Sequence, residues 1–131
     1  MGKNTITSVH CVMKYKDSYY CVWNDKHNKY APIGGKTDPG ESEIETLARE
    51  IKEEVVIKGV EKLERLGAHT HVREDKTKVN VAMYLLETSS IPQSGKEDFI
   101  TVVKLTPELA KSLTPDNSYT TLIAIRDKLS I

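Results

Sequence analysis

Residues 43–54 carry four glutamates that helical spacing places on one face, Glu43, Glu50, Glu53 and Glu54. Like charges at this spacing repel by about 0.2–0.5 kcal/mol per pair, and the last three also lie where the helix dipole disfavours carboxylates. Hard cations such as Mg²⁺ bind one or two carboxylates and leave their other positions to water and phosphate oxygens. The pattern therefore predicts a divalent metal site, and a solvated acidic face is the alternative interpretation.

A glycine pair, Gly34 and Gly35, opens the stretch GGKTDPGESEIETLAREIKEEVVI that contains these glutamates. Glycine lets the backbone approach a ligand closely, since it has no Cβ. A main-chain carbonyl of the pair can therefore join the same cation as the carboxylates.

The glutamate segment is predicted to be an amphipathic helix that begins at Ser42. Ser42 suits the N-cap position, and Glu45 three residues later completes a capping box. The apolar residues at helical spacing predict a packed stripe on a different face from the acids. This stripe consists of Ile44, Leu47, Ala48, Ile51 and Val55.

Strands and two further helices are predicted around this helix. Alternating apolar residues on both sides of the turn KDS predict a β-hairpin, and a second strand pair is joined by the polar REDKTK. The order of elements excludes a simple parallel βαβ repeat and predicts an α/β (α+β) fold, with a mixed β-sheet flanked by helices. The expected strands are 9–15, 20–22, 30–33, 62–72, 79–87 and 99–105, with a loop at 91–98, a short helix capped by Thr106 with Pro107 at its first position, and a last helix from Asp116 or Ser118 to about Leu129.

The chain has 131 residues, with 19 basic and 19 acidic side chains that give a net charge of zero. This length suits one domain, residues 1–131, and the lack of a basic block argues against binding of a nucleic-acid polymer. No apolar run reaches the roughly 18 residues of a membrane span. Cys11 and Cys21 lack the spacing of a metal or redox motif and are not expected to face each other, so we expect reduced thiols and a cytoplasmic protein.

Counted from Gly35, the chain reads glycine, five residues, Glu41, seven residues, and then REIKEEVVI from Arg49. This spacing resembles the Nudix box, G-x5-E-x7-R-E-U-x-E-E-x-G-U with U aliphatic, at every fixed position but one, where Val56 replaces the late glycine. The segment YAPIGGKTDPGE is also similar to the segment that leads into this motif in the family. There an aromatic residue and a Gly-Gly pair are followed by an acidic residue and a closing Gly-Glu. The resemblance implies an α/β/α sandwich with a mixed sheet and a Mg²⁺-dependent hydrolase of nucleoside diphosphates linked to another moiety.

The resemblance also implies which residues bind the metal. Glu50, Glu53 and Glu54 would act as metal ligands and catalytic residues, together with the main-chain carbonyl of Gly34. Glu50 and Glu54, one helical turn apart, would be the firmest ligands. Mg²⁺ is the expected ion, with Mn²⁺ as an alternative.

Other residues are implied to support the site. Glu41 and Arg49 would form an ion pair that ties the glycine-rich loop to the helix, with Gly35 in the supporting turn. Most members of the family also use an acid from a later loop as base or extra ligand. Glu97 and Asp98 are the candidates, and two solvated loop acids are an equally good interpretation.

Val56 is the departure from the family pattern. The family glycine ends the helix in a left-handed conformation, which a β-branched residue resists. The helix should therefore continue by one turn to Gly59, or Val56 should open an extended segment directly. Neither outcome removes a carboxylate, so we expect catalysis to survive.

Two groups of residues outside the box could contact a substrate. Aromatic side chains could stack on a base, although such residues in strands more often belong to the core. A basic row on one strand face could meet a phosphate or a base, or be ordinary surface. The aromatic group is Tyr19, Tyr20, Trp23 and Tyr84, and the basic row is His69, His71 and Arg73.

The resemblance makes a small nucleotide the expected substrate, with a nucleoside triphosphate, as for MutT-like members, as the leading candidate. ADP-ribose, dinucleoside polyphosphates and capped RNA stay open, and the zero net charge argues against long RNA. We expect a monomer or homodimer. The alternative function is a nucleotide-sensing or partner-binding module that has lost hydrolysis. The complete set Glu50, Glu53 and Glu54 favours the enzyme.

Overall fold

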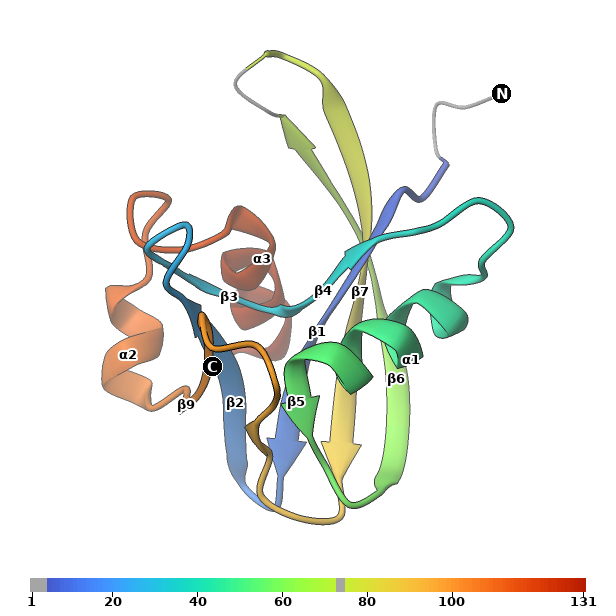
Figure 1. Cartoon of the computed structure of the whole chain (residues 1–131). Coiled ribbons are helices and arrows are strands. Elements are labelled where there is room, and N and C mark those ends of the chain that lie inside the picture. The colour runs from blue at the N-terminus through green and yellow to red at the C-terminus, as the bar shows by residue number, and fades with distance from the viewer. Residues whose placement is uncertain (1–4, 73–74) are drawn as a thin grey trace.

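A mixed β-sheet forms the centre of the molecule (Figure 1). The computed structural model describes residues 5–72 and 75–131, and within them the sheet has seven strands. The strands of the chain are β1 (Ser8–Tyr15), β2 (Ser18–Asn24), β3 (Lys29–Ala31), β4 (Ile33–Lys36), β5 (Val55–Val56), β6 (Val60–Val72), β7 (Lys78–Thr88), β8 (Gln93–Ser94) and β9 (Ile100–Lys104). Their order in the sheet is β3-β2-β1-β7-β6, with β4 added to β1 and β9 added to β2. β1 and β7 pair in parallel, and the other pairs are antiparallel.

Helices cover both faces of this sheet (Figure 1). α1 (Glu43–Glu54) lies on one face, and α2 (Pro107–Ser112) and α3 (Thr120–Leu129) lie on the other. The side chains of β1 point to both faces of the sheet and so take part in two hydrophobic cores. Val9 packs with Leu47 of α1, whereas Val12 packs with Leu122 of α3. This arrangement confirms the predicted α/β/α sandwich with a mixed sheet.

Local capping signals place the first two helices where the sequence predicts them. The Ser42 hydroxyl accepts from the Glu45 N–H at 3.1 Å, and Glu45 Oε1 accepts from the Ser42 N–H at 2.8 Å. Thr106 Oγ1 likewise accepts from the Leu109 N–H at 3.1 Å, with Pro107 at the first position of α2. These bonds satisfy backbone donors that the helix itself cannot pair.

The predicted start of the last helix is wrong, because α3 begins at Thr120 instead of following Asp116 or Ser118. The segment before it continues the sheet. The Tyr30 N–H donates to the Asn117 carbonyl at 2.8 Å, and the Tyr119 N–H donates to the Tyr30 carbonyl at 2.9 Å. These two bonds form a β-bridge between Tyr30 and Ser118 and keep Tyr119 extended, at φ −67° and ψ 139°. A long-range pairing therefore overrides the local helix signals.

The end of α1 settles the outcome of the Val56 substitution. The helix stops at Glu54, and Val55 is already extended at φ −139° and ψ 163°. Val55 pairs with Ser94 and Val56 with Gln93, so β5 and β8 form a two-stranded sheet. The extended segment is thus the correct alternative, the helix does not continue to Gly59, and the predicted loop 91–98 contains the short strand β8.

The first hairpin has the register that the sequence predicts for its cysteines. Met13 lies opposite Tyr20, and Cys11 lies opposite Ile33 of β4 instead of Cys21. Both thiols are buried and free. Within residues 5–72 and 75–131, no helix has the length and apolar character needed to cross a membrane.

The predicted faces of α1 are partly wrong. Leu47 is buried, but Ile44 is 49% exposed and Ala48 is also exposed. Glu54 is instead only 8% exposed. The helix is rotated so that part of its acidic face is turned toward the protein, where Glu54 and Glu43 find hydrogen-bond donors.

Candidate active site

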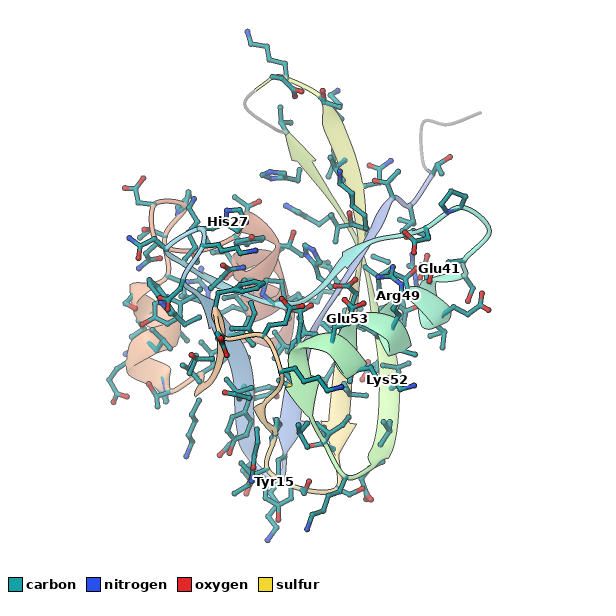
Figure 2. The ribbon with its side chains drawn as sticks, viewed as in Figure 1. Tyr15, His27, Glu41, Arg49, Lys52 and Glu53 are labelled. Carbon is teal, nitrogen blue, oxygen red and sulfur yellow. The ribbon has the colours of Figure 1, made fainter. Side chains whose placement is uncertain are left out.

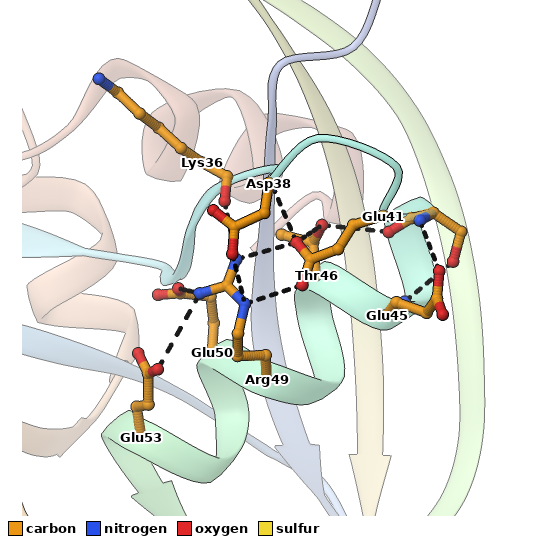
Figure 3. Close-up of polar contacts among 9 residues, drawn as sticks. Lys36, Asp38, Glu41, Glu45, Thr46, Arg49, Glu50 and Glu53 are labelled. Carbon is orange, nitrogen blue, oxygen red and sulfur yellow. Dashed lines mark hydrogen bonds and ion pairs between the residues drawn. The ribbon is translucent and has the colours of Figure 1, made fainter.

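Arg49 joins the loop before α1 to the carboxylates of the helix (Figure 3). Its Nε donates to Glu41 Oε2 at 2.9 Å, and its Nη2 donates to Glu41 Oε1 at 3.0 Å and to the Lys36 carbonyl at 2.9 Å. Its Nη1 donates to Glu50 Oε2 at 2.6 Å. Hydrogen bonds from Arg49 and from the backbone of Asp38 lower the pKa of Glu41 to about 2. The structure thus brings the predicted supporting pair Glu41 and Arg49 together and adds Glu50 to it.

Glu54 and Glu50 form a carboxylate pair at the C-terminal half of α1. The two glutamates lie one helical turn apart, and Glu54 is 8% exposed. The Gly34 N–H donates to Glu54 Oε2 at 3.3 Å. Burial and then Glu50 raise the pKa of Glu54 to about 8. Three of the predicted metal-site residues therefore lie together.

This carboxylate pair suits a hard divalent cation. Burial and the neighbouring Glu50 disfavour the ionised form of Glu54, and a bound cation would remove that conflict. Within the two described ranges, no three His, Cys, Asp or Glu side chains are arranged to enclose a metal ion. The donors from the protein would therefore be Glu50, Glu54 and the carbonyl of Gly34, with water and substrate oxygens as the remainder, as is usual for Mg²⁺.

Glu53 is the most exposed of the three predicted carboxylates, at 50% of its side chain, and its Oε1 lies 4.0 Å from the same Arg49 Nη1 that donates to Glu50 (Figure 3). Of the two late-loop acids, Glu97 lies close enough for its charge to contribute to the raised pKa of Glu54. The Glu97 carbonyl accepts from the Ile100 N–H at 3.1 Å, at the start of β9. Glu97 rather than Asp98 is thus the late-loop acid that the structure relates to the carboxylate pair.

The glycine pair is needed for two different reasons. A Cβ on Gly34 would lie 1.9 Å from the Val9 carbonyl oxygen, and its φ of +147° also favours glycine. A Cβ on Gly35 would instead meet the Glu50 carboxylate, 2.7 Å from Cδ. Gly34 therefore permits the backbone path, whereas Gly35 leaves room for a predicted metal ligand.

Gly35→Ala should lower kcat about tenfold while the protein still folds, because the added methyl displaces only the end of the Glu50 side chain. Turnover and urea unfolding would be measured together. Gly59→Ala is the matched control, since its Cβ also meets a side-chain end, Ser89 Oγ at 2.9 Å, but outside the site. Equal activity of the two variants would contradict the assigned role of Gly35.

The free energy of unfolding of the metal-free protein should contain a term that falls as pH rises from about 4.5 to about 8. Glu54 has a raised pKa in the folded state, so the folded protein holds its proton more tightly than the unfolded chain does. Glu41 has the opposite effect on stability, because its pKa is lowered in the folded state. The stabilisation that it contributes is lost only as pH falls from about 4.5 toward about 2. Urea unfolding in chelator across this range should show the decline in wild type and a flatter profile in Glu54→Gln. Identical pH profiles of wild type and Glu54→Gln would contradict this prediction.

Glu43, the fourth glutamate of the predicted acidic face, has a different environment from the carboxylate pair. The Tyr84 hydroxyl donates to Glu43 Oε1 at 2.6 Å. Arg65 on β6 donates to both oxygens of Glu43, at 2.9 and 3.1 Å. Glu43 therefore fastens the first turn of α1 to β6 and β7.

The predicted aromatic candidates belong mostly to the body of the protein. Tyr20 and Tyr84 are 9% and 6% exposed, and both lie in the core on the α1 side of the sheet. Tyr19 packs against the other core. Trp23 donates its Nε1–H to Asp25 Oδ1 at 2.7 Å and packs edge-on against another ring, 4.8 Å between centroids.

The predicted basic row faces the start of α3. His71 Nδ1 lies 2.9 Å from Thr120 Oγ1, and His69 Nε2 lies 3.4 Å from the same oxygen. Burial, followed by the charge of His71, lowers the pKa of His69. Arg73 lies outside the described residues. The two histidines thus share one hydroxyl on the face of the sheet opposite α1.

Sequence reasoning missed an aromatic row that consists of His27, Tyr119 and His10. His27 and Tyr119 have ring centroids 6.3 Å apart, and so have Tyr119 and His10. The members come from the β2–β3 turn, the start of α3 and β1. No local signal predicts this row, because contacts between rings of distant segments have no fixed spacing in the sequence.

The NUDIX domain family matches residues 9–121 of the chain. The chain belongs to the Nudix family. This finding confirms the family that the box indicates, despite Val56. No curated protein sequence gives a significant match to this Nudix chain.

Solved structures share the Nudix fold over nearly the whole chain. A NUDIX hydrolase from Nitrosomonas europaea has a TM-score of 0.77 at 16% identity and covers 96% of this chain and 89% of its own. The pyrophosphohydrolase BsRppH of Bacillus subtilis has a TM-score of 0.70 at 18% identity, with 98% and 84% covered. An Ap4A hydrolase of C. elegans has a TM-score of 0.65 at 22% identity, with 94% and 95% covered. At these identities the likeness establishes the fold.

Proposed function

We propose that this Nudix protein is a metal-dependent pyrophosphohydrolase that cleaves a nucleoside diphosphate linked to another moiety. The observation that carries the proposal is the carboxylate pair Glu50 and Glu54 beside the backbone of Gly34. Family membership and solved neighbours that include a pyrophosphohydrolase and an Ap4A hydrolase support a hydrolase acting on phosphoric anhydride bonds. A nucleoside triphosphate is the first substrate to test.

The proposed reaction assigns a task to each part of the site. Mg²⁺ or Mn²⁺ held by the carboxylate pair and the Gly34 carbonyl would neutralise the pyrophosphate and acidify the attacking water. Arg49 holds Glu50 in place through its 2.6 Å hydrogen bond. Glu97 would accept the proton of the water. The water oxygen bonds to phosphorus, the bond from phosphorus to the bridging oxygen breaks, and the leaving phosphate keeps the electron pair.

The experiment is a panel of nucleotides incubated with Mg²⁺, with Mn²⁺ or with chelator, with products identified by phosphorus NMR. The panel contains nucleoside triphosphates, ADP-ribose, dinucleoside polyphosphates and a short capped RNA. The expected result is metal-dependent cleavage of a phosphoric anhydride bond in at least one of them. Binding without cleavage across the panel would overturn the proposal and favour a nucleotide-sensing module.

Three further properties stay predictions. The two free, buried thiols support a reducing, cytoplasmic location. The zero net charge supports a small substrate over a nucleic-acid polymer. A monomer or a homodimer is expected, and light scattering would distinguish them.

A further inference from the structure

Strand β6 forms an open edge of the central sheet. It is the last strand in the order β3-β2-β1-β7-β6, and within residues 5–72 and 75–131 only β7 pairs with it. The opposite edge is partly closed, because Tyr30 of β3 forms a bridge with Ser118. β6 has 13 residues, all of them exposed or half-buried. An open edge of this length presents backbone N–H and C=O groups with which another strand can pair.

Two β-bulges limit the regular part of this edge. The register of β6 with β7 shifts once at residues 60–62 and again at residues 65–67. Bulges and charged side chains on edge strands commonly discourage pairing with other chains. The charges of residues 61–65, between the two shifts, therefore decide whether this segment repels a second strand or accepts one.

The charges of this segment are symmetric about its central leucine. The segment reads Glu61, Lys62, Leu63, Glu64 and Arg65. If two copies pair antiparallel about Leu63, Glu61 lies opposite Arg65 of the second copy, and Lys62 lies opposite Glu64 of the second copy. Every charged pair then joins opposite signs, which stabilises a sheet. Two copies of this segment are therefore complementary to each other.

Neighbouring registers of the same two strands bring like charges together. In a symmetric antiparallel pair, the two-fold axis passes through one residue and its own copy. An axis through Lys62 places two ammonium groups opposite each other, and an axis through Glu64 places two carboxylates opposite each other. Like charges in these positions destabilise the pairing. The charges thus favour the register that is centred on Leu63.

The side chains of the segment are available for these pairs. Lys62 and Glu64 are exposed, and within the described ranges their side chains form no ion pair or hydrogen bond. Arg65 binds Glu43 but is still 44% exposed. Leu63 and Arg65 lie on the α1 face of the sheet, since one packs in the core on that side and the other binds Glu43. Lys62 and Glu64 therefore lie together on the opposite face.

Exposed apolar side chains lie next to this edge. Ile44 belongs to the stripe of α1 that was expected to pack, but it is 49% exposed. It follows Glu43, which Arg65 binds, so the first turn of α1 lies beside β6. Val60, directly before the segment, is 55% exposed. A second copy at this edge would remove part of this apolar surface from water.

We infer that β6 is the interface of a homodimer, in which two copies pair antiparallel through residues 61–65 about a two-fold axis at Leu63. The pairing joins two seven-stranded sheets into one. Figure 2 shows Arg49 and Glu53 on the side of α1 that faces β4, whereas the first half of β6 lies at the right of the sheet. The interface leaves the candidate active site open, so the inference does not depend on the proposed hydrolysis.

The test is the mass of the protein in solution, measured by analytical ultracentrifugation over a range of concentrations. Wild type should change from monomer to dimer as the concentration rises. Lys62→Glu and Glu64→Lys each bring like charges together at two symmetric positions, so each should raise the dissociation constant about tenfold or more. Circular dichroism verifies that both variants are folded. A wild type that stays monomeric at every soluble concentration, or variants that dimerise as wild type does, would overturn the inference.

Two combinations of these variants restore the complementary charges. An equimolar mixture of Lys62→Glu and Glu64→Lys should form a heterodimer, because two glutamates of one chain then lie opposite two lysines of the other. The double variant Lys62→Glu/Glu64→Lys should dimerise with itself, and it has the net charge of wild type. If either the mixture or the double variant stays monomeric, the inference is wrong.

Lys111→Glu is the matched control for the change in net charge. Lys111 is exposed on α2, which follows β9 near the opposite edge of the sheet (Figure 1). The variant changes the net charge as Lys62→Glu does but leaves β6 unchanged, so it should dimerise like wild type. Equal weakening by Lys111→Glu and Lys62→Glu would assign the effect to net charge and would overturn the inference.

Discussion

Replacement of Glu54 by Gln is expected to lower kcat by on the order of a hundredfold or more while the protein stays folded. A metal site supplies several kcal/mol of transition-state stabilisation, and each 1.36 kcal/mol corresponds to a factor of ten in rate. Gln keeps the shape of the side chain but removes one charge of the carboxylate pair. It also resembles the protonated Glu54 that burial favours, so the unfolding midpoint in chelator should rise at pH 8.

Glu53→Gln is the comparison for this variant. Glu53 lies on the same helix, but its side chain is 50% exposed, whereas Glu54 is only 8% exposed. A smaller loss of kcat is expected, with little change in stability. Turnover of Glu54→Gln within a few-fold of wild type on the true substrate would show that the acids of α1 are only a solvated surface.

Replacement of Arg49 by Ala should reduce both activity and stability. Activity should fall by about tenfold to a hundredfold, the range typical of residues that orient metal ligands. The variant loses the bonds to Glu41, Glu50 and the Lys36 carbonyl at once, so loop and helix separate. Thermal unfolding and turnover, measured on the same preparation, test this expectation.

Two further variants separate geometry from charge at this position. Arg49→Lys keeps the charge but cannot make the forked contact with Glu41, so most of the activity loss should remain. Arg126→Ala removes an arginine that donates to the Ala110 carbonyl at 2.8 Å, between α3 and the end of α2. It should lower stability and leave kcat of the folded protein unchanged. Wild-type activity in Arg49→Ala would show that the hydrogen bonds of Arg49 have no part in the site.

Elements with local causes could be predicted from the sequence. Ser42 and Glu45 contain the whole signal for the start of α1, and Thr106 with Pro107 does the same for α2. The bonds involved span three residues, so no knowledge of the fold is needed. The resemblance to the Nudix box likewise predicted that Glu50, Glu54 and Gly34 belong to one site, and the hydrogen bond from the Gly34 N–H to Glu54 brings strand and helix together.

Features with long-range causes could not be predicted. The start of α3 depends on Tyr30, which pairs with residues 117–119 across most of the chain. The rotation of α1 depends on donors from Gly34 and Tyr84, which reduce the cost of turning glutamates toward the protein. The aromatic row joins three distant segments through ring contacts, which leave no periodic trace in the sequence.

The pairing of β5 with β8 has a mechanical consequence for Glu97. The Gly95 N–H donates to the Glu54 carbonyl at 3.1 Å, and a methyl on Gly95 would fall 2.8 Å from the Glu54 carbonyl carbon. The two backbones are therefore in contact two residues before Glu97. A movement of this segment away from α1 would break the bond between Gly95 and the last residue of the helix. Valine favours the extended conformation that the pairing of β5 with β8 needs, so Val56 suits a direct connection between the end of α1 and the segment that leads to Glu97.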